Sequence, residues 1–350
     1  MSMMYRMSGI LRPLVFRQNI RCLGTQELSK VLVTRRVPQL AMDILKTSQS
    51  CDLDVWDSDD PIPRAELLKR AQGKDGLYVL LTEKVDAELL DAAGPQLRVV
   101  STMSVGYDHV TTKELKNRNI PLGYTPNVLT DATATLTVAL LLATSRRLIE
   151  AVGEVKNGGW STWKPMWMCG ATLRGSTVGI VGLGRIGLAV AQRLLPFGVS
   201  KIVYSGWKAT PEVEKQVNAT HVDNDALFAK SDFVLGCTAL TQETQGMFNK
   251  DAFSKMKSTA IFVNTSRGGV VNQDDLYDAL KDNAIRAAGL DVTVPEPLPT
   301  DHKLLSLPNC VILPHIGSAE DATRTEMATL AARNLLAGLR GEQMPAQADL

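Results

Sequence analysis

The sequence predicts an α/β protein in which one doubly wound, parallel-sheet domain is inserted in another α/β domain. Three observations support this class. The chain has 350 residues, too many for one ordinary hydrophobic core. Short apolar runs alternate with amphipathic helical patterns along most of it, which is typical of βαβ units. One of these runs leads into a glycine-rich turn and then a helix, as at the start of many doubly wound sheets.

The elements follow from the spacing of apolar residues, which is two in strands and between three and four in helices. In the first series we expect a strand at 30–34, a helix at 64–71, a strand at 76–82, a helix at 85–93, a strand at 97–102 and one long helix at 132–149. In the second series we expect strands at 178–181, 201–204, 233–236, 260–264, 287–291 and 311–313, helices between them such as 274–284, and a last helix at 319–339 ending at Gly341.

The two series predict the domain boundaries. We expect residues 126–310 to form a Rossmann-type doubly wound domain. Residues 29–125 and 311–350 would form a flavodoxin-like α/β domain, closed by the last helix. Residues 1–28 stand apart, because no acidic residue occurs before Glu27 while four arginines lie among apolar residues. That pattern is typical of a mitochondrial presequence, although a disordered tail or an unused upstream start codon also fits. The expected compartment is therefore the mitochondrial matrix or the cytoplasm.

Composition excludes several classes of function. The apolar content of 45% and charged content of 21% are typical of a soluble globular protein. A net charge of +1 gives no electrostatic reason for binding nucleic acid or an anionic membrane. No apolar run reaches the roughly 18 residues that a membrane span needs. The scattered cysteines form no CxxC pair, so we expect no metal site and no disulfide framework.

A GxGxxG motif lies between a predicted strand and a predicted helix, with a further strand after it. Gly182 permits the tight turn, Gly184 lets the backbone approach a pyrophosphate, and Gly187 lets helix and strand pack closely. The helix N-terminus offers free N–H groups to phosphates. A glycine-rich turn alone also occurs in other α/β proteins, but the complete setting predicts dinucleotide binding.

The end of the next strand indicates which dinucleotide is bound. NAD enzymes usually have Asp or Glu there to accept hydrogen bonds from the ribose 2′-hydroxyl, and residues 204–211 contain no carboxylate. Lys208 can attract a 2′-phosphate, and Ser205 and Thr210 can donate hydrogen bonds. We therefore expect NADP(H), with NAD(H) used at lower efficiency. Lys208 also fits an ordinary solvated lysine.

Three ionisable residues follow later predicted strands. Arg267 precedes two glycines and can hold a planar carboxylate through two parallel hydrogen bonds. His315 can donate a proton to a carbonyl oxygen, and Glu296, between two prolines, can stabilise the imidazolium. These are the groups needed to reduce a 2-oxo acid. Taken singly, each also fits a structural role, but of the four histidines only His315 follows a strand in this way.

The sequence resembles the D-isomer-specific 2-hydroxyacid dehydrogenase family from about residue 31 to the C-terminus. The resemblance rests on residues 99–109, 122–131, 178–190, 264–275, 287–291 and 313–318. It implies reduction of small 2-oxo acids such as glyoxylate and hydroxypyruvate, with catalytic Arg267, Glu296 and His315. The further residues that it implies are Val105 and Gly106 for the substrate, and Gly184, Arg185, Ile186, Trp207, Lys208, Ala239, Thr265, Asp291 and Gly317 for the cofactor.

The resemblance also implies a homodimer whose interface includes the long helix and the loop at 158–168, which holds three tryptophans. Two departures are visible: relatives often have arginine where this chain has Trp207, Lys208 and Thr210, and Thr135 replaces a common glutamate. Two alternatives stay open. One is a family dehydrogenase for another 2-hydroxy acid, and the other is an NAD(H)-binding scaffold like the C-terminal binding protein corepressors.

Overall fold

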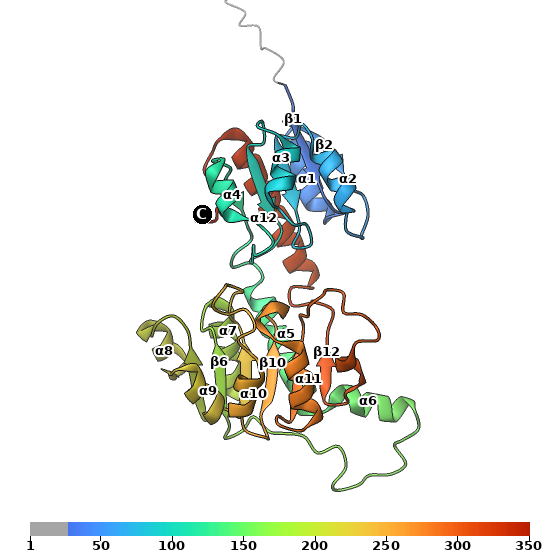
Figure 1. Ribbon diagram of the computed structural model, residues 1–350, viewed down its shortest axis with the longest axis vertical. Coiled ribbons are helices and arrows are strands. Elements are labelled where there is room, and N and C mark those ends of the chain that lie inside the picture. Colours follow the sequence, from blue (N-terminus) through green and yellow to red (C-terminus); the bar gives the residue numbers. More distant parts are fainter. Residues whose placement is uncertain (1–26) are drawn as a thin grey trace, which may run out of the picture.

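The computed structural model describes residues 27–350 and contains two parallel sheets, each with helices packed against it (Figure 1). The first sheet has the order β2-β1-β3-β4-β5. This is the flavodoxin-like order 2-1-3-4-5, in which the second strand lies at one edge. The strands are β1 Ser29–Val33, β2 Cys51–Val55, β3 Gly76–Val79, β4 Val99–Thr102 and β5 Leu122–Gly123. The predicted presequence falls on residues 1–26, outside the described residues.

The helices of the first domain are α1 Gln39–Thr47, α2 Arg64–Ala71, α3 Ala87–Ala93, α4 Thr112–Asn117 and, from the other end of the chain, α12 Asp321–Arg340. Helix α12 packs against α1, β3 and β4. Its small residues allow close approach: a Cβ added at Gly338 would be 2.5 Å from Val99. The Tyr78 hydroxyl also donates to the carbonyl oxygen of Ala328 at 3.1 Å. The last helix is therefore a core element of the first domain.

The second sheet has seven strands in the order β12-β11-β10-β9-β6-β7-β8. If β6 is counted as the first strand of this sheet, the order from β8 is 3-2-1-4-5-6, followed by β12 as an added strand. This is the Rossmann order, so the Rossmann-type prediction is confirmed. The strands are β6 Thr177–Val181, β7 Lys201–Ser205, β8 Ala219–His221, β9 Phe233–Gly236, β10 Ile261–Asn264, β11 Ala287–Leu290 and β12 Cys310–Ile312. The helices are α5 Thr130–Ser145, α6 Leu148–Lys156, α7 Arg185–Leu194, α8 Pro211–Val217, α9 Asn224–Lys230, α10 Lys250–Lys255 and α11 Gln273–Lys281.

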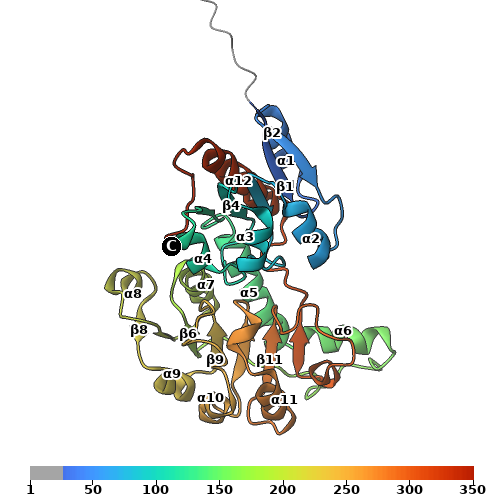
Figure 2. The ribbon, with the colours of Figure 1, turned by 45° about the horizontal axis from the view of Figure 1, so that its top comes forward.

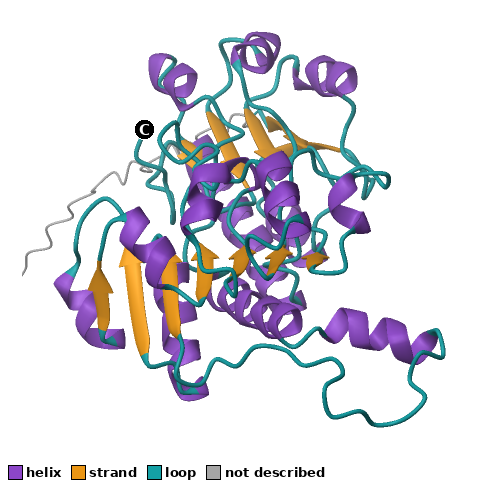
Figure 3. Ribbon diagram, turned by 60° about the horizontal axis from the view of Figure 1, so that its bottom comes forward, coloured by secondary structure: helices purple, strands orange, loops and turns teal. Residues whose placement is uncertain are grey.

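The predicted single helix at 132–149 is wrong, because the structure breaks it into α5 and α6. Arg147 has a φ of 55° and so leaves the right-handed helix. The carbonyl oxygen of Ser145 accepts a hydrogen bond from the Ala171 N–H at 2.8 Å. Ala171 therefore supplies the donor that the next turn of the helix would otherwise have supplied. Helix α6 then projects from the domain together with the loop that follows it (Figure 3).

Among residues 27–350 no single helix is long and apolar enough to cross a membrane, and only the bent pair of α5 and α6 reaches that threshold by length and composition. The same residues contain no group of three or more His, Cys, Asp or Glu side chains that could hold a metal ion. All four described cysteines are free thiols.

Candidate active site

Figure 2 shows the first domain lying against the edge of the second domain at which α5 and α7 begin. A cavity of about 640 Å³ is lined by residues of both domains. Both sheets contribute to it from segments that follow the carboxyl ends of their strands, where parallel α/β sheets bind ligands. The predicted site residues that line it are Val105, Gly106, Gly184, Arg185, Ile186, Ala239, Thr265, Arg267, Asp291, His315 and Gly317. The predicted residues outside its lining are Gly182, Gly187, Trp207, Lys208 and Glu296.

The three glycines of the turn after β6 have different surroundings. Gly182 has a φ of 96°, and a Cβ there would be 2.8 Å from the carbonyl oxygen of Cys237. A Cβ on Gly187 would collide with the carbonyl oxygen of Gly182. In contrast, nothing lies within 4 Å of a Cβ built on Gly184. Gly182 and Gly187 are therefore required by packing, whereas Gly184 leaves open space beside the cavity.

The N-terminus of α7 fits a dinucleotide pyrophosphate. Gly184 is its N-cap, no side chain caps its N–H groups, and its first turn holds no acidic residue. Free amides and the positive end of the helix dipole favour a phosphate there. The Arg185 guanidinium is held nearby by donating to Asn127 Oδ1 at 2.6 Å.

The loop after β12 is shaped by Asp291, which is almost fully buried at the end of β11. His315 has a φ of 55°, an unusual conformation for a non-glycine residue. Its N–H donates to the Asp291 carbonyl oxygen, and the Ile316 and Gly317 N–H groups donate to the Asp291 carboxylate, each at 2.8 Å. Burial raises the pKa of Asp291, although the two amides and the charge of His315 oppose this. Asp291 thus fixes the imidazole's position.

Glu296 lies behind His315, on a loop in which the Val294–Pro295 and Glu296–Pro297 peptide bonds are both cis. Its Oε2 is 2.8 Å from His315 Nδ1, and its Oε1 accepts from the Thr293 N–H at 3.0 Å. Burial opposes ionisation of Glu296, but the hydrogen bond and charge of His315 outweigh it and hold the pKa of Glu296 below its usual value. With Nδ1 engaged, Nε2 is the nitrogen that His315 can use toward the cavity.

Arg267 approaches from β10 and meets the first domain. Its Nε donates to Asp108 Oδ1 at 2.8 Å, and its Nη1 donates to the Ser266 carbonyl oxygen at 2.9 Å. A Cβ at position 106 would overlap Arg267 Nη2, so a larger residue there would displace the guanidinium. Burial disfavours the charged form of Asp108, yet the charge and hydrogen bond of Arg267 hold its pKa below the usual value. Sequence reasoning missed Asp108, although it lies in the 99–109 segment.

The backbone at Val105 and Gly106 is available to a ligand. Neither N–H donates a hydrogen bond to the described residues. Both residues line the cavity beside Arg267. Two free amides next to a guanidinium form a cradle for a carboxylate.

The segment after β7 is much more exposed. Ser205 is buried and its hydroxyl has no hydrogen-bond partner among residues 27–350, whereas the Trp207 side chain is 88% exposed. Lys208 is exposed and makes no ion pair with a described residue. The Thr210 N–H donates to the Tyr204 hydroxyl, which in turn donates to Glu214 Oε1, each at 2.8 Å.

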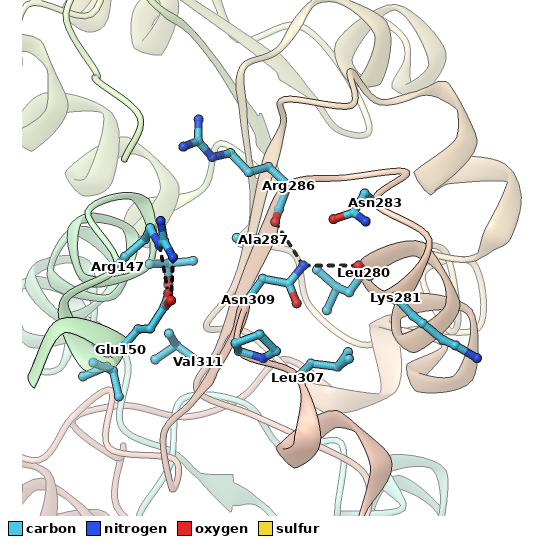
Figure 4. A pocket seen from close by; sticks show the side chains of 13 residues that line it. Arg147, Glu150, Leu280, Lys281, Asn283, Arg286, Ala287, Leu307, Asn309 and Val311 are labelled. Atoms are coloured by element: carbon cyan, nitrogen blue, oxygen red, sulfur yellow. Dashed lines mark hydrogen bonds and ion pairs between the residues drawn. The ribbon is translucent and has the colours of Figure 1, made fainter. Parts of the chain in front are cut away.

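A second cavity of about 380 Å³ lies at the opposite, amino edge of the larger sheet (Figure 4). Arg286 precedes β11 there, and the Asn309 amide donates to the carbonyl oxygens of Leu280 and Arg286. Arg147 and Glu150 form an ion pair on its other wall. None of the predicted site residues lines this cavity, so we place the active site between the domains.

Fold and site together define a dinucleotide-dependent oxidoreductase. A family model described as "D-isomer specific 2-hydroxyacid dehydrogenase, NAD binding domain" matches residues 138–317. The chain belongs to the D-isomer-specific 2-hydroxyacid dehydrogenase family.

Curated relatives and solved structures cover nearly the whole chain. The chain is 57% identical over 323 residues to glyoxylate reductase/hydroxypyruvate reductase of Homo sapiens, covering 92% of this chain and 98% of that protein. It is 47% identical over 320 residues to glyoxylate reductase of Thermofilum pendens, covering 91% of this chain and 93% of that protein. The TT0316 protein from Thermus thermophilus superposes with a TM-score of 0.85 at 42% identity, covering 91% and 100%. An NADPH-dependent glyoxylate/hydroxypyruvate reductase from Sinorhizobium meliloti, in complex with NADP and malonate, superposes with a TM-score of 0.78 at 29% sequence identity. The match covers 92% of this chain and 97% of that one.

Proposed function

We propose that the protein is an NADP(H)-dependent reductase that converts glyoxylate to glycolate and hydroxypyruvate to D-glycerate. The observation that carries this proposal is the meeting of Arg267, two free amides and His315 in one cavity, with Glu296 behind the imidazole and a turn suited to a pyrophosphate beside it. The name of the human relative supports both substrates, and that of the Thermofilum pendens relative supports glyoxylate.

Each group has one task in this reaction. The bound nicotinamide supplies the hydride. Arg267 and the N–H groups of Val105 and Gly106 hold the substrate carboxylate and orient the 2-oxo carbon. Protonated His315 donates from Nε2 to the carbonyl oxygen, so that hydride and proton together give the 2-hydroxy acid. The Glu296 carboxylate stabilises the imidazolium before the transfer and fixes the ring.

The coenzyme preference rests on charge at the end of β7. Residues 204–211 contain no carboxylate that would repel a 2′-phosphate, and the Lys208 ammonium is free of acidic partners among the described residues. The buried hydroxyl of Ser205 stands where a ribose-binding acid is usual. We therefore propose a preference for NADPH over NADH.

One assay separates this proposal from its rivals. The purified protein is mixed with NADPH and glyoxylate, hydroxypyruvate, pyruvate or 3-phosphohydroxypyruvate, and the near-ultraviolet absorbance of reduced nicotinamide is followed. Rapid loss with the first two substrates supports the reductase. Turnover confined to another acid would indicate a different family dehydrogenase. Tight coenzyme binding without turnover would favour the regulatory scaffold.

We also propose that the protein is a homodimer. Helix α6 has no buried residue, and it and the following loop project from the body of the molecule (Figure 3). The large exposed apolar side chains of this segment are Leu148, Ile149, Val152, Val155, Trp160, Trp163 and Met166. Sedimentation velocity should give twice the mass of the chain, and replacing Ile149 and Val152 with Asp should give monomers. A monomer in the unmodified protein would contradict this proposal.

For the compartment, we propose that residues 1–26 direct the protein to the mitochondrial matrix. Their acid-free, arginine-bearing composition supports this. The full chain fused to a fluorescent protein should enter mitochondria, and a version starting at Met followed by residue 27 should stay in the cytosol. Cytosolic fluorescence from the full-length fusion would contradict it.

A further inference from the structure

The loop that follows β4 is backed by polar side chains that the proposed reaction does not use. This loop presents the free N–H groups of Val105 and Gly106, the carboxylate cradle, to the cavity. The side chains behind it are those of Thr102, Ser104 and His109. Thr102 and Ser104 are buried, and His109 is partly exposed. Buried polar groups so close to the cradle call for a physical account, because each must find a hydrogen-bond partner.

Three hydrogen bonds join these side chains to the cradle. The Ser104 hydroxyl donates to the Gly106 carbonyl oxygen at 2.8 Å. Thr102 Oγ1 lies 2.8 Å from Ser104 Oγ and 3.0 Å from His109 Nε2. The bonds therefore form one continuous chain from the imidazole of His109 to the backbone of Gly106.

The last bond of this chain fixes the direction of the others. A carbonyl oxygen can only accept, so the single hydroxyl proton of Ser104 is used toward Gly106. Ser104 must then accept from the Thr102 hydroxyl, which uses the only proton of Thr102. Thr102 in turn accepts from His109, so Nε2 of a neutral imidazole is the nitrogen that carries the hydrogen. A chain in which every donor is used once is rigid and cooperative.

The loop is also held by the backbone of the neighbouring segment. The Thr125 N–H, just after β5, donates to the Ser104 carbonyl oxygen at 2.9 Å. The Ser104 hydroxyl bond spans Val105 and closes on Gly106. With the loop tied at residues 104 and 106, the peptide groups between them cannot rotate without leaving a buried polar group unsatisfied. The cradle amides thereby keep one orientation.

We propose that Thr102, Ser104 and His109 are positioning residues, which hold the carboxylate cradle in the orientation that receives the substrate. This inference deepens the proposed function and rests on it. The three side chains act through the backbone of Val105 and Gly106 and transfer neither proton nor hydride. Their loss should therefore weaken binding of the carboxylate in ground state and transition state alike, which raises KM more than it lowers kcat.

The test removes single links of the chain. Thr102→Val deletes the hydroxyl with little change in shape, and Thr102→Ser keeps it. Thr125→Val is the matched control, because Thr125 is equally buried and its hydroxyl has no hydrogen-bond partner among residues 27–350. His109→Leu removes the donor at the start of the chain, and His109→Gln keeps a side-chain N–H donor there.

Two quantities are measured in each variant. Steady-state kinetics with saturating NADPH give KM and kcat for glyoxylate. The change in NADPH fluorescence gives the Kd of oxamate, an unreactive analogue that keeps the carboxylate. In Thr102→Val this KM and this Kd should both rise roughly 3- to 10-fold, as for one lost neutral hydrogen bond, while kcat changes by less than about twofold. Thr102→Ser should restore most of the binding, and Thr125→Val should match the unmodified protein. His109→Leu should resemble Thr102→Val, with His109→Gln between.

The outcomes separate this inference from the proposed function. An unchanged KM and Kd in Thr102→Val, a fall in kcat alone, or an equal rise in Thr125→Val would overturn the positioning role and leave the reductase in place. If Thr102→Val does not fold by circular dichroism, Ser104→Ala, which breaks the last link, decides the result. If the unmodified protein reduces neither glyoxylate nor hydroxypyruvate, the proposed function fails and the oxamate Kd of Thr102→Val alone decides the inference. An unmodified protein that also fails to bind oxamate would overturn both.

Discussion

The catalytic corner and the coenzyme segment of this protein lie beside the same edge of the larger sheet, yet they are held very differently. The catalytic corner comprises Asp108, Arg267, Asp291, Glu296 and His315, and each side chain has a partner from another segment at 2.8 Å. The coenzyme segment, residues 205–210, is tied by the Thr210 N–H to the Tyr204 hydroxyl, and Trp207 and Lys208 extend into solvent.

The difference follows from what each region has to do. Proton donation requires a donor within hydrogen-bond distance of one oxygen, so a small displacement of His315 costs much of the rate. Discrimination between coenzymes depends on charge near a phosphate, which an exposed lysine can supply without fixed geometry. We therefore expect substitutions in the catalytic corner to have large effects and those in the coenzyme segment to have smaller ones.

The largest effect is expected for His315→Asn. Without the proton donor, kcat for glyoxylate reduction should fall by roughly two to four orders of magnitude, while the Kd for NADPH stays nearly unchanged. Stopped-flow rates and NADPH fluorescence titration measure the two quantities.

In Glu296→Gln the decrease in kcat should be smaller than in His315→Asn. The reduction rate falls as the pH rises and His315 loses its proton, and in this variant the fall should begin at a lower pH, because the imidazolium has lost its carboxylate. A Glu296→Gln pH profile like that of the unmodified protein would remove Glu296 from the mechanism.

Arg267→Lys should come next. A lysine keeps the charge but cannot make two parallel hydrogen bonds to a carboxylate, so kcat/KM for the oxo acid should fall roughly 10- to 100-fold. The KM for NADPH should stay close to its original value. Steady-state kinetics with both substrates check this, with Arg333→Lys as the control at an exposed site. Normal oxo-acid kinetics in the Lys variant would argue against a bidentate clamp.

The catalytic corner should also make the protein sensitive to acid through His109, next to Asp108. Burial lowers the pKa of His109 from 6.5 to about 4, so between these pH values the unfolded chain binds more protons than the folded protein. The free energy of unfolding should therefore decrease as pH falls through this window, by about 2 kcal/mol at pH 5. Urea unfolding at pH 7 and pH 5 should show that His109→Gln loses less stability than His302→Gln. Equal losses would contradict the assignment.

The smallest effect is expected in the coenzyme segment. The unmodified protein should use NADPH at least about tenfold more efficiently than NADH, as one charge-assisted contact allows. Lys208→Ala should reduce this ratio, and Ser205→Asp should reverse it by adding a ribose acceptor and a repulsive charge. Lys201→Ala, at the other end of β7, is the matched control. A preference for NADH in the unmodified protein would show that the missing acid does not set selectivity.

Much of this site could be predicted because its residues follow strands of one parallel sheet. The carboxyl ends of such strands meet at one edge, so Gly184, Arg267 and His315 could be expected to converge from local patterns alone. The Asp108–Arg267 ion pair could not be predicted in this way, because the two residues are 159 positions apart and belong to different domains.

The helix break shows the limit of periodicity. The apolar spacing at 132–149 continues across Arg147. The left-handed φ of Arg147, which separates α5 from α6, depends on the loop segment that returns at Ala171. Such a tertiary contact overrides local propensity without altering the pattern. The same holds for His315, whose φ of 55° is fixed by Asp291.

The place of α12 has a consequence for biosynthesis. This helix covers β3 and β4, so the first sheet is completed by residues that a ribosome adds only after the whole second domain. Domains generally fold as units while the chain grows. Here the inserted domain can bury its own core first, while the earlier-made strands wait with one apolar face exposed. Nascent chains stalled before residue 321 should therefore bind chaperones through the first sheet, although its strands were the earliest to leave the exit tunnel.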